Sequence, residues 1–493
     1  MMTRQPWDFA LALDRTSARP LFLQITRAIV DDICRGRLQP GDMLPGTRTL
    51  AASLQVNRVT VLTAYDELAA EGWITTYRSR GCLVSPELPQ DVPRPADSGP
   101  FDRMPGYPLA DASIVRRSPE HLRNLLVFAA SSPDARLLDV EPLARAYRRA
   151  LRKTGGGLLG YATPEGHPRL RAAIAAMLTT ARGVPAGPEH VFVTRGSQMA
   201  LSLIARAVLP PASAIAVEAL GYRNAWQAFS AAGAELIPIP VDRDGLDVTA
   251  LSRVLETRSI AAVYTTPHHQ FPTTVTMSPA RRLELLELAR ARAFAILEDD
   301  YDHEFHFDGR PILPLASLDR RGVVIYVGSF SRLLVPGIRL GFIAGPGALL
   351  ERLGAAREFI DMQGDTVTEA AVAELLDDGE VQRHVRRVRR VYRTRRDLLA
   401  RLLRDGFGSE LDFTVPGGGV GLWVKAPGVD AQRWVSAALE RGVAFQAGQE
   451  FAFDGRPRQW VRLGYAALNE NELRIAVGHL RAAYDTVLER RRA

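Results

Sequence analysis

The stretch VVIYVGSFSRLLVPGIRLGF, residues 323–342, joins an apolar run to a polar turn. Its first eight residues are typical of a strand that is buried on both faces of a parallel sheet. The turn that follows carries Ser329, Ser331 and Arg339 around Pro336 and Gly337. Because ligands of open α/β sheets bind beyond the carboxyl ends of the strands, this stretch predicts an α/β domain with a binding site at that edge.

The rest of the region from about residue 115 to the end shows the same alternation of helical and apolar strand patterns. This is typical of an α/β fold with a mainly parallel sheet. The other predicted strands are HVFVT (190–194), AIAVE (214–218), AAVYTT (261–266) and FAILEDD (294–300).

Several of these strands lead into chemically useful residues. Gly196 and Ser197 open a helix, whose free N–H groups suit a phosphate. Asp299 and Tyr301 end the FAILEDD strand, and Tyr222 begins a helix where its ring could cover a flat ligand. Together these features suit a phosphorylated, nitrogen-containing ring, although each alone also fits a packed turn, a helix cap or a surface acid.

The first 85 residues have a different pattern. A helix is predicted from Pro20 to a stop at Gly36, and two more helical patterns flank a short break before Asn57, which is a good N-cap. A strand, a basic turn and a second strand follow in residues 73–84. Three helices and a β-wing predict a winged helix-turn-helix, with residues for DNA contact at Arg48, Asn57, Arg58, Thr60, Arg78 and Arg80.

Length and composition agree with a multidomain protein. The chain has 493 residues, 46% of them hydrophobic, and a formal net charge of +7, which alone does not establish a nucleic-acid partner. A proline-rich linker is predicted at 86–114, between domains at 1–85 and 115–493. Two cysteines exclude a disulfide framework, and the sequence has no run of about 20 apolar residues, so we expect a cytoplasmic protein without a membrane span.

The N-terminal pattern closely resembles the DNA-binding domain of GntR-family transcriptional regulators. The resemblance covers nearly all of residues 20–84 and is clearest in LPGTRTLAASLQVNRVTVLTAYDELAAEGW, residues 44–73. It implies that Arg48, Arg58, Thr60 and the wing glycine Gly81 contact operator DNA. Gly46 stands where the family usually has a capping serine, and glycine is a serviceable N-cap.

The C-terminal region resembles fold-type I pyridoxal-phosphate enzymes, and in particular the aminotransferase-like domain of MocR-type regulators. The motifs include GYATPEGHPRLRAAIA (160–175), EDDYDHEFHFDGRP (298–311) and VRLGYAALNENEL (461–473). The resemblance implies a smaller C-terminal α+β subdomain and a homodimer. It further implies that the phosphate of pyridoxal 5′-phosphate is held by Gly196, Ser197, Ser329, Ser331 and Arg339, and that its ring is held by Tyr222, Asp299 and Tyr301. By the same resemblance, Arg462 receives an amino-acid carboxylate.

Two positions depart from that family pattern. Arg332 stands where the family has the lysine that forms the internal aldimine, and a guanidinium with a pKa above ~12 cannot supply a neutral amine. The only lysines of the chain are Lys153 and Lys425, and neither lies in a motif that would replace it. Thr274 stands where the family commonly has glycine, which could narrow the pocket.

Three hypotheses follow from the sequence. We favour a transcriptional regulator with a catalytically inactive aminotransferase-like domain that senses pyridoxal phosphate, held non-covalently, or an amino acid or their adduct. The second is an active aminotransferase with an appended DNA-binding domain, and the third is a regulator whose C-terminal domain only dimerises. Arg332 argues against the second hypothesis and does not separate the other two.

One further segment is strongly basic. Residues 382–404 contain ten arginines and one acid, on a helical pattern with an apolar stripe. A solvated helical face explains this pattern, and a supplementary DNA contact is the alternative.

Overall fold

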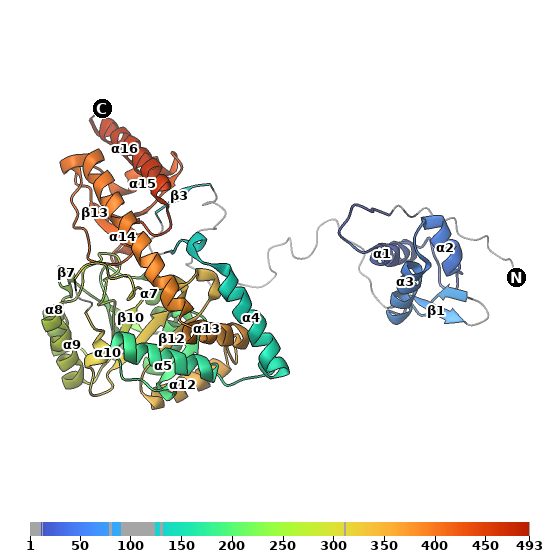
Figure 1. Cartoon of the computed structure of the whole chain (residues 1–493), viewed down its shortest axis with the longest axis horizontal. Helices are drawn as coiled ribbons and strands as arrows, with labels where there is room; N and C mark the ends of the chain where they lie inside the picture. The colour runs from blue at the N-terminus through green and yellow to red at the C-terminus, as the bar shows by residue number, and fades with distance from the viewer. Residues whose placement is uncertain are drawn as a thin grey trace. The chain divides into compact units, whose positions relative to one another are not determined.

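The computed structural model describes residues 11, 13–77, 81–89, 124–128, 132–309 and 312–492. The chain forms two compact units, Met1–Arg116 and Arg117–Ala493 (Figure 1). Arg78, Arg80 and most of the predicted linker lie outside the described residues. No helix in the described ranges is long and apolar enough to cross a membrane.

The N-terminal unit is a winged helix-turn-helix, as predicted. Its elements are α1 (Leu21–Cys34), α2 (Thr47–Leu54), α3 (Arg58–Ala70) and the antiparallel wing strands β1 (Ile74–Tyr77) and β2 (Gly81–Val84). Gly46 caps α2, and the side chain of Asn57 caps α3 by accepting a hydrogen bond from the Val59 N–H at 2.9 Å. The apolar faces of the three helices meet in one core that contains Ile25, Ile29, Leu50, Val61 and Leu68.

A seven-stranded sheet organises the larger unit, with strand order β4-β12-β11-β10-β9-β5-β6. Neighbouring strands are parallel except around β12, which is antiparallel to both β11 and β4. The strands are β4 (Val191–Thr194), β5 (Ala214–Glu218), β6 (Glu235–Ile239), β9 (Ala262–Thr265), β10 (Ala295–Asp300), β11 (Val324–Ser329) and β12 (Gly341–Ala344). The predicted α/β class and mainly parallel sheet are therefore confirmed.

Alternate residues of each strand face two different helical layers. On β10, Ile296 packs with helices on one face of the sheet, and Leu297 packs with helices on the other. The first layer contains α5 (Pro168–Arg182), α8 (Val248–Thr257), α9 (Pro279–Arg292), α10 (Leu315–Leu318) and α13 (Thr366–Asp377). The second contains α6 (Ser197–Val208), α7 (Arg223–Ala231) and α12 (Gly347–Glu358). Helices α4 (Val140–Thr154) and α11 (Phe330–Leu333) complete this part.

The C-terminal part is a smaller α+β subdomain with its own core. Its sheet has the order β13-β16-β15 and is built from β13 (Gly421–Lys425), β15 (Gln446–Ala447) and β16 (Trp460–Gly464). Helices α14 (Glu380–Phe407), α15 (Ala431–Leu439) and α16 (Glu470–Arg492) pack with it (Figure 1). Short pairs are β3 (Leu126–Val127) with β14 (Val443–Ala444), and β7 (Val241–Asp242) with β8 (Gly245–Leu246).

Single turns of 3₁₀ helix connect several of these elements. They are η3 (Ala135–Leu137), η4 (Gly155–Leu158), η5 (Pro188–His190), η6 (Pro336–Ile338), η7 (Gly408–Glu410) and η8 (Gly448–Phe451). The turn η6 matters for the site, because it carries the chain from α11 to Arg339 and β12.

Candidate functional site

The predicted phosphate-binding residues lie where β4 meets α6. Gly196 is the N-cap of α6 and has φ +81°, a left-handed conformation that favours glycine. A Cβ on Gly341 of β12 would lie 2.8 Å from the Gly196 carbonyl carbon, so this strand packs directly under the loop. The N–H groups at the start of α6 therefore stand at the carboxyl edge of the sheet, as a phosphate site requires.

Arg339 faces the same loop. Its Nη2 donates a hydrogen bond to the Arg195 carbonyl oxygen at 3.1 Å and would lie 3.3 Å from a Cβ on Gly196. Arg339 itself has φ +50°, an uncommon conformation for a residue with a side chain. Such backbone strain often accompanies functional sites.

Ser329 ends β11, and Ser331 lies two residues later in α11. The Ser329 hydroxyl accepts a hydrogen bond from the Ser331 N–H at 3.2 Å and caps α11. The buried Ser331 Oγ has no hydrogen-bond partner among the described residues. A buried hydroxyl without a partner costs free energy, so a ligand that bonds it would relieve that cost.

Asp299 lies near the end of β10 and is 5% exposed. The Tyr264 hydroxyl donates a hydrogen bond to its Oδ2 at 2.8 Å, and its buried Oδ1 has no partner in the described part of the chain. Burial raises the pKa of Asp299 to about 6, although the Tyr264 hydrogen bond and the Arg332 cation act in the opposite direction. The carboxyl group is therefore available to a cationic ring nitrogen.

Arg332 lies on α11 and is held by an aromatic ring. Its Cζ is 4.3 Å from the centroid of the Tyr301 ring, within cation–π range. Its buried Nη1 has no hydrogen-bond partner among the described residues. Lys425, by contrast, ends β13 in the C-terminal subdomain, where its Nζ lies 6.0 Å from the Trp460 ring centroid. Lys153 belongs to α4.

Tyr222, Tyr301 and Arg462 meet at an aromatic cluster centred on Phe271. The Phe271 ring centroid is 5.9 Å from that of Tyr222 and 6.0 Å from that of Tyr301, both edge-on. The Arg462 Cζ lies 4.8 Å from the same ring. The Tyr301 hydroxyl donates to the His269 carbonyl oxygen at 2.8 Å, which leaves its oxygen lone pairs for a ligand. These contacts bring the ring-binding and carboxylate-binding residues of the prediction together.

Arg462 is completely buried on β16. It donates a hydrogen bond to the Pro272 carbonyl oxygen, and burial lowers the pKa of its guanidinium. A guanidinium held in this way keeps a fixed orientation, which suits a carboxylate-binding role.

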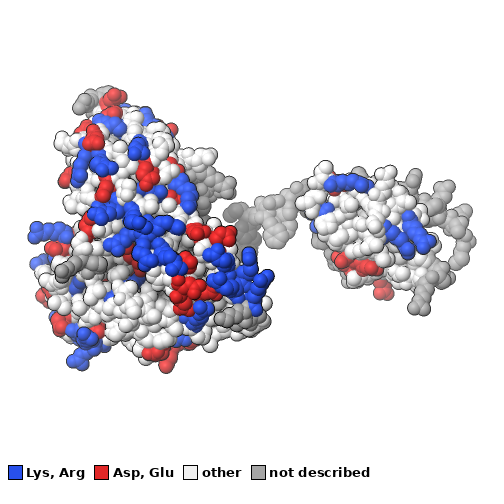
Figure 2. Space-filling view, in the orientation of Figure 1, with Lys and Arg blue, Asp and Glu red and all other residues white. Residues whose placement is uncertain are grey.

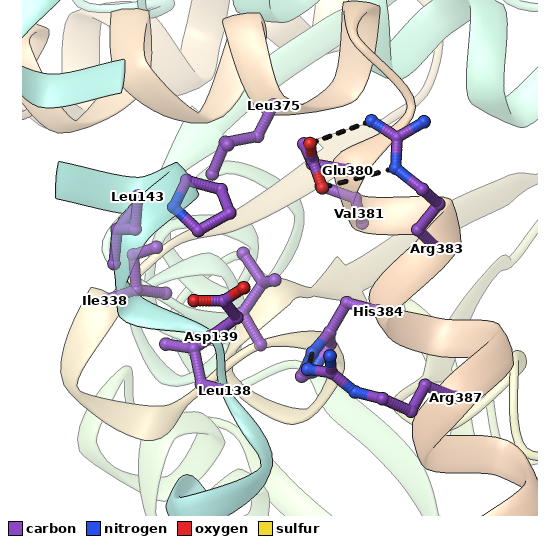
Figure 3. A pocket seen from close by; sticks show the side chains of 12 residues that line it. Leu138, Asp139, Leu143, Ile338, Leu375, Glu380, Val381, Arg383, His384 and Arg387 are labelled. Atoms are coloured by element: carbon purple, nitrogen blue, oxygen red, sulfur yellow. Dashed lines mark hydrogen bonds and ion pairs between the residues drawn. The ribbon is translucent and has the colours of Figure 1, made fainter. Parts of the chain in front are cut away.

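A large cavity adjoins the loop that is predicted to bind phosphate. It has a volume of about 720 Å³, and its lining includes Arg195, Gly337, Arg339, Gln363 and Glu369. A second, smaller pocket of about 160 Å³ lies between the segment around Leu138 and the first turns of α14 (Figure 3). Figure 3 shows apolar side chains such as Leu143 and Leu375 on its wall, with Arg383 and His384 along α14. None of the residues that are predicted to bind the cofactor lines this second pocket.

Five of the predicted DNA-contacting residues lie within the described part of the N-terminal unit, and Arg78 and Arg80 lie outside it. Arg48 on α2 and Arg58 at the start of α3 are exposed, and Arg58 Nε lies 3.4 Å from the Thr47 hydroxyl. Thr60 is half-buried in the first turn of α3. Gly81 begins β2 with φ +83° and has open space around its Cα.

The basic run of residues 382–404 forms most of α14. Arg386, Arg389, Arg390 and Arg393 are exposed, and Figure 2 shows basic side chains gathered over this helix. Arg395 and Arg396 are buried, where Arg395 Nη1 pairs with Asp134 at 3.0 Å and Arg396 with Asp308. Part of the run is therefore structural rather than free for a partner.

Sequence reasoning missed two groups in this region. Tyr264, which bonds Asp299, lies inside the apolar strand β9 and gave no polar signal. Four histidines also cluster beyond the ends of β9 and β10, and their density in the segments 268–269 and 303–306 is a signal that the sequence carries.

Comparison with known proteins supports both parts of the architecture. The family described as aminotransferase class I and II matches residues 125–480, and the gntR family of bacterial regulatory proteins matches residues 21–84. The probable rhizopine catabolism regulatory protein MocR of Rhizobium meliloti is 33% identical over 481 residues, covering 96% of each chain. The HTH-type transcriptional regulator TauR of Rhodobacter capsulatus is 32% identical and covers 92% of this chain and 95% of its own.

Enzymes with the same fold are also similar to the larger unit. The structure of LysN, the α-aminoadipate aminotransferase of Thermus thermophilus, has a TM-score of 0.70 and 33% identity, covering 75% of this chain and 94% of that one.

Proposed function

Because the chain belongs to the MocR-type regulators of the GntR family, we propose that it is a sequence-specific regulator whose aminotransferase-like domain senses a ligand without catalysing transamination. The observation that carries this proposal is Arg332, which occupies the turn after β11 beside an otherwise complete set of cofactor-binding groups. A guanidinium stays protonated and cannot act as the amine nucleophile. The effector is pyridoxal 5′-phosphate, an amino acid or their adduct.

The residues fit pyridoxal phosphate held without a covalent bond. When bound, this group supplies an electron-withdrawing pyridine ring with an aldehyde. The open N–H groups at Gly196 and Ser197, the unpartnered Ser331 hydroxyl, Ser329 and the Arg339 cation support a phosphate-binding role. The remaining ligand contacts that we propose are Asp299 to the ring nitrogen, Tyr222 to the ring face, Tyr301 to the phenolic oxygen, Arg332 as a nearby cation, and Arg462 to an effector carboxylate.

Asp299 gives the strongest support for a nitrogen heterocycle. It is a buried carboxyl group with one oxygen bonded by Tyr264 and the other without a described partner. A protonated ring nitrogen would donate to that free oxygen and neutralise the charge that burial disfavours. Water or a neutral ligand atom would satisfy the hydrogen bond but not the charge.

The second candidate is an active pyridoxal-phosphate aminotransferase with an appended DNA-binding domain. The likeness of the larger unit to LysN favours it, because that protein is an aminotransferase. An active aminotransferase requires an amine that carries a proton at the reacting carbon, and the guanidinium of Arg332 is a poor proton carrier. Lys425 packs over Trp460 in the C-terminal subdomain, so it does not replace the amine missing at Arg332. This position supports a domain without transaminase activity.

We also propose a homodimer that forms beside the 720 Å³ cavity. Large apolar side chains are exposed there, with Phe359 92% and Tyr161 88% exposed. The segments that carry Tyr161 and Phe359 are joined through Gln363, which is hydrogen-bonded to the backbone of Gly160 and Ala162. Gly160 and Gln363 also line the cavity. Such a patch marks an interaction surface. A second copy of the chain would cover it and place two DNA-binding domains on two half-sites.

The domain limits of the proposal are residues 1–85 for DNA binding, 86–114 for the linker and 115–493 for ligand sensing and dimerisation. Exposed Arg48 and Arg58 support duplex-DNA binding, with Asn57, Thr60, Arg78, Arg80 and Gly81 completing the contact set. A regulator of this kind acts in the cytoplasm, where its operator DNA is.

The proposal is tested with the purified full-length chain. After incubation with pyridoxal phosphate and gel filtration, we expect absorption to show one cofactor per chain. Denaturation should release this cofactor, whether or not the protein is first treated with borohydride. Arg339→Gln and Asp299→Ala should each weaken retention at least tenfold, while the exposed control Arg243→Gln should not. Retention of a borohydride-stable adduct at Lys153 or Lys425 would establish the second candidate instead. Failure of the wild type to bind the cofactor would leave dimerisation as the role of the domain.

A further inference from the structure

Four of the nine histidines in the chain lie close together beyond the carboxyl ends of β9 and β10. They are His268 and His269, which follow β9, and His303 and His306, which follow β10. The His268 ring centroid lies 4.6 Å from those of His269 and His303 and 6.2 Å from that of His306. None of these rings belongs to the proposed cofactor-binding set.

His268 is the least satisfied member of the cluster. It is 3% exposed, and neither ring nitrogen has a hydrogen-bond partner among the described residues. Leaving buried polar atoms unpaired costs free energy, so the fold holds an imidazole there at a cost.

His269 and His306 are oriented by neighbouring groups. The Nδ1 of His269 lies 2.8 Å from Asp302 Oδ1, and His306 makes a backbone hydrogen bond to Gly309. The buried His306 Nε2 has no hydrogen-bond partner in the described part of the chain. The His269 ring, held by Asp302 through Nδ1, turns its Nε2 away from that carboxylate. Metal-binding histidines show this arrangement, in which a carboxylate or a backbone carbonyl fixes the ring through the other nitrogen.

Acidic groups beside the rings can compensate a buried positive charge. Asp302 Oδ2 and Asp300 Oδ1 are buried and have no hydrogen-bond partner among the described residues. A dication at the rings would be balanced by these two acids.

We propose that His268, His269 and His306 form a three-histidine site for a divalent transition-metal ion of the zinc class. One ligand atom from each ring lies within 4.8 Å of the others, and nitrogens of a tetrahedral site lie about 3.3 Å apart, since Zn–N bonds are about 2.0–2.1 Å. Side-chain shifts of about 1 Å would complete the site. Three imidazoles favour zinc, cobalt, nickel or copper over magnesium or calcium.

A neighbouring set, His268 with Asp300 and His303, has the same spacing. We assign the metal to the three histidines because Asp300 and His303 already bond each other at 2.9 Å, and the Tyr326 hydroxyl bonds the same Asp300 oxygen at 2.6 Å. These two residues are therefore occupied, whereas the His306 Nε2 is free. His306 is also half-buried, so it lies at the side from which an ion would enter.

The test uses the untagged full-length chain, stripped of metal with a chelator and titrated with Co²⁺. We expect one Co²⁺ per chain after gel filtration, with the visible absorption of a tetrahedral nitrogen site, and displacement by Zn²⁺. His268→Gln and His306→Gln should each weaken binding at least tenfold. His479→Gln, on the exposed face of α16, is the matched control and should bind as the wild type does.

Other outcomes are equally decisive. Absence of bound metal in the wild type, or full stoichiometry in His306→Gln, would overturn the proposal. The His303→Gln variant should still bind the metal. If His303→Gln loses the metal while His306→Gln retains it, the metal binds instead at the neighbouring set of His268, Asp300 and His303. Because His306 is half-buried, the His306→Gln variant should fold even if His268→Gln does not. Circular dichroism of the metal-free proteins shows whether each variant is folded.

Discussion

The guanidinium of Arg332 stacks on Tyr301, with Cζ 4.3 Å from the ring centroid. It is held there by an aromatic face and not by an ion pair within the described residues, and it is close enough to Asp299 to lower the pKa of that carboxyl group. A permanent cation thus lies close to both Tyr301 and Asp299, the two residues that we propose to contact the cofactor ring. Such a cation can attract an anionic ligand but cannot form a covalent bond with it.

We predict that Arg332→Lys restores covalent capture of pyridoxal phosphate. The shorter side chain brings a titratable amine to the same turn without changing Asp299, Tyr301 or Arg339. Borohydride treatment followed by peptide mass spectrometry should find a cofactor-linked peptide containing residue 332 in the variant and none in the wild type. Arg332→Gln, which lacks an amine, is the control, and a linked peptide in that control would refute the assignment.

Cofactor binding should depend on pH through Asp299. Its pKa is raised to about 6, so the carboxyl group is neutral at pH 5 and charged at pH 8, when it pairs with a protonated ring nitrogen. Binding by the wild type should therefore weaken as the pH falls through about 6. The phosphate of the ligand also titrates near this pH.

The ratio of Kd values for Asp299→Asn and wild type isolates the contribution of Asp299. Fluorescence titrations should give a ratio that rises as the pH increases from 5 to 8. A ratio that stays constant would show that Asp299 does not contact the ring nitrogen. Tyr264, Arg332, Asp300 and Asp302 set the field at this carboxyl group and are unchanged in the comparison.

Thr274→Gly should stabilise the larger unit. Thr274 has φ +64°, a left-handed conformation that a β-branched residue adopts only under strain. The substitution relieves a backbone strain of about 1–3 kcal/mol, but glycine also gives the unfolded chain more conformational entropy. The net effect should be a gain of about 1 kcal/mol in the free energy of unfolding. Denaturant unfolding should show a higher midpoint with an unchanged slope. Thr273→Gly, at a neighbouring position without positive φ, should not stabilise, and equal effects at both positions would contradict the explanation.

Arg58→Ala should weaken specific DNA binding by about 1–3 kcal/mol if the side chain reads a base. The residue is exposed in the first turn of α3, where a recognition helix enters the major groove. Binding to selected genomic fragments should fall more than binding to random duplex. Arg27→Ala on α1 is a control for loss of one positive charge. Unchanged binding by an Arg48/Arg58 double-alanine protein would rule out this surface.

Local patterns in the sequence determined the elements and their order. Asn57 caps α3 and Gly196 caps α6 because these positions depend on backbone conformation over a few residues. The apolar runs predicted the central strands, since burial on both faces requires apolar residues throughout. Asp299, Ser329 and Arg339 could be proposed as site residues from the sequence because ligands of open α/β sheets bind beyond the carboxyl ends of the strands.

Tertiary structure alone decided which of these residues touch. The register that pairs Thr265 of β9 with Glu298 of β10 brings the segments after both strands together, and with them the four histidines. The stacking of Arg332 on Tyr301 and the bond from Tyr264 to Asp299 depend on the same packing across neighbouring strands. Sequence periodicity specifies which face of a strand is buried, but strand register and side-chain packing set the distances between strands, and the chemistry of this site depends on those distances.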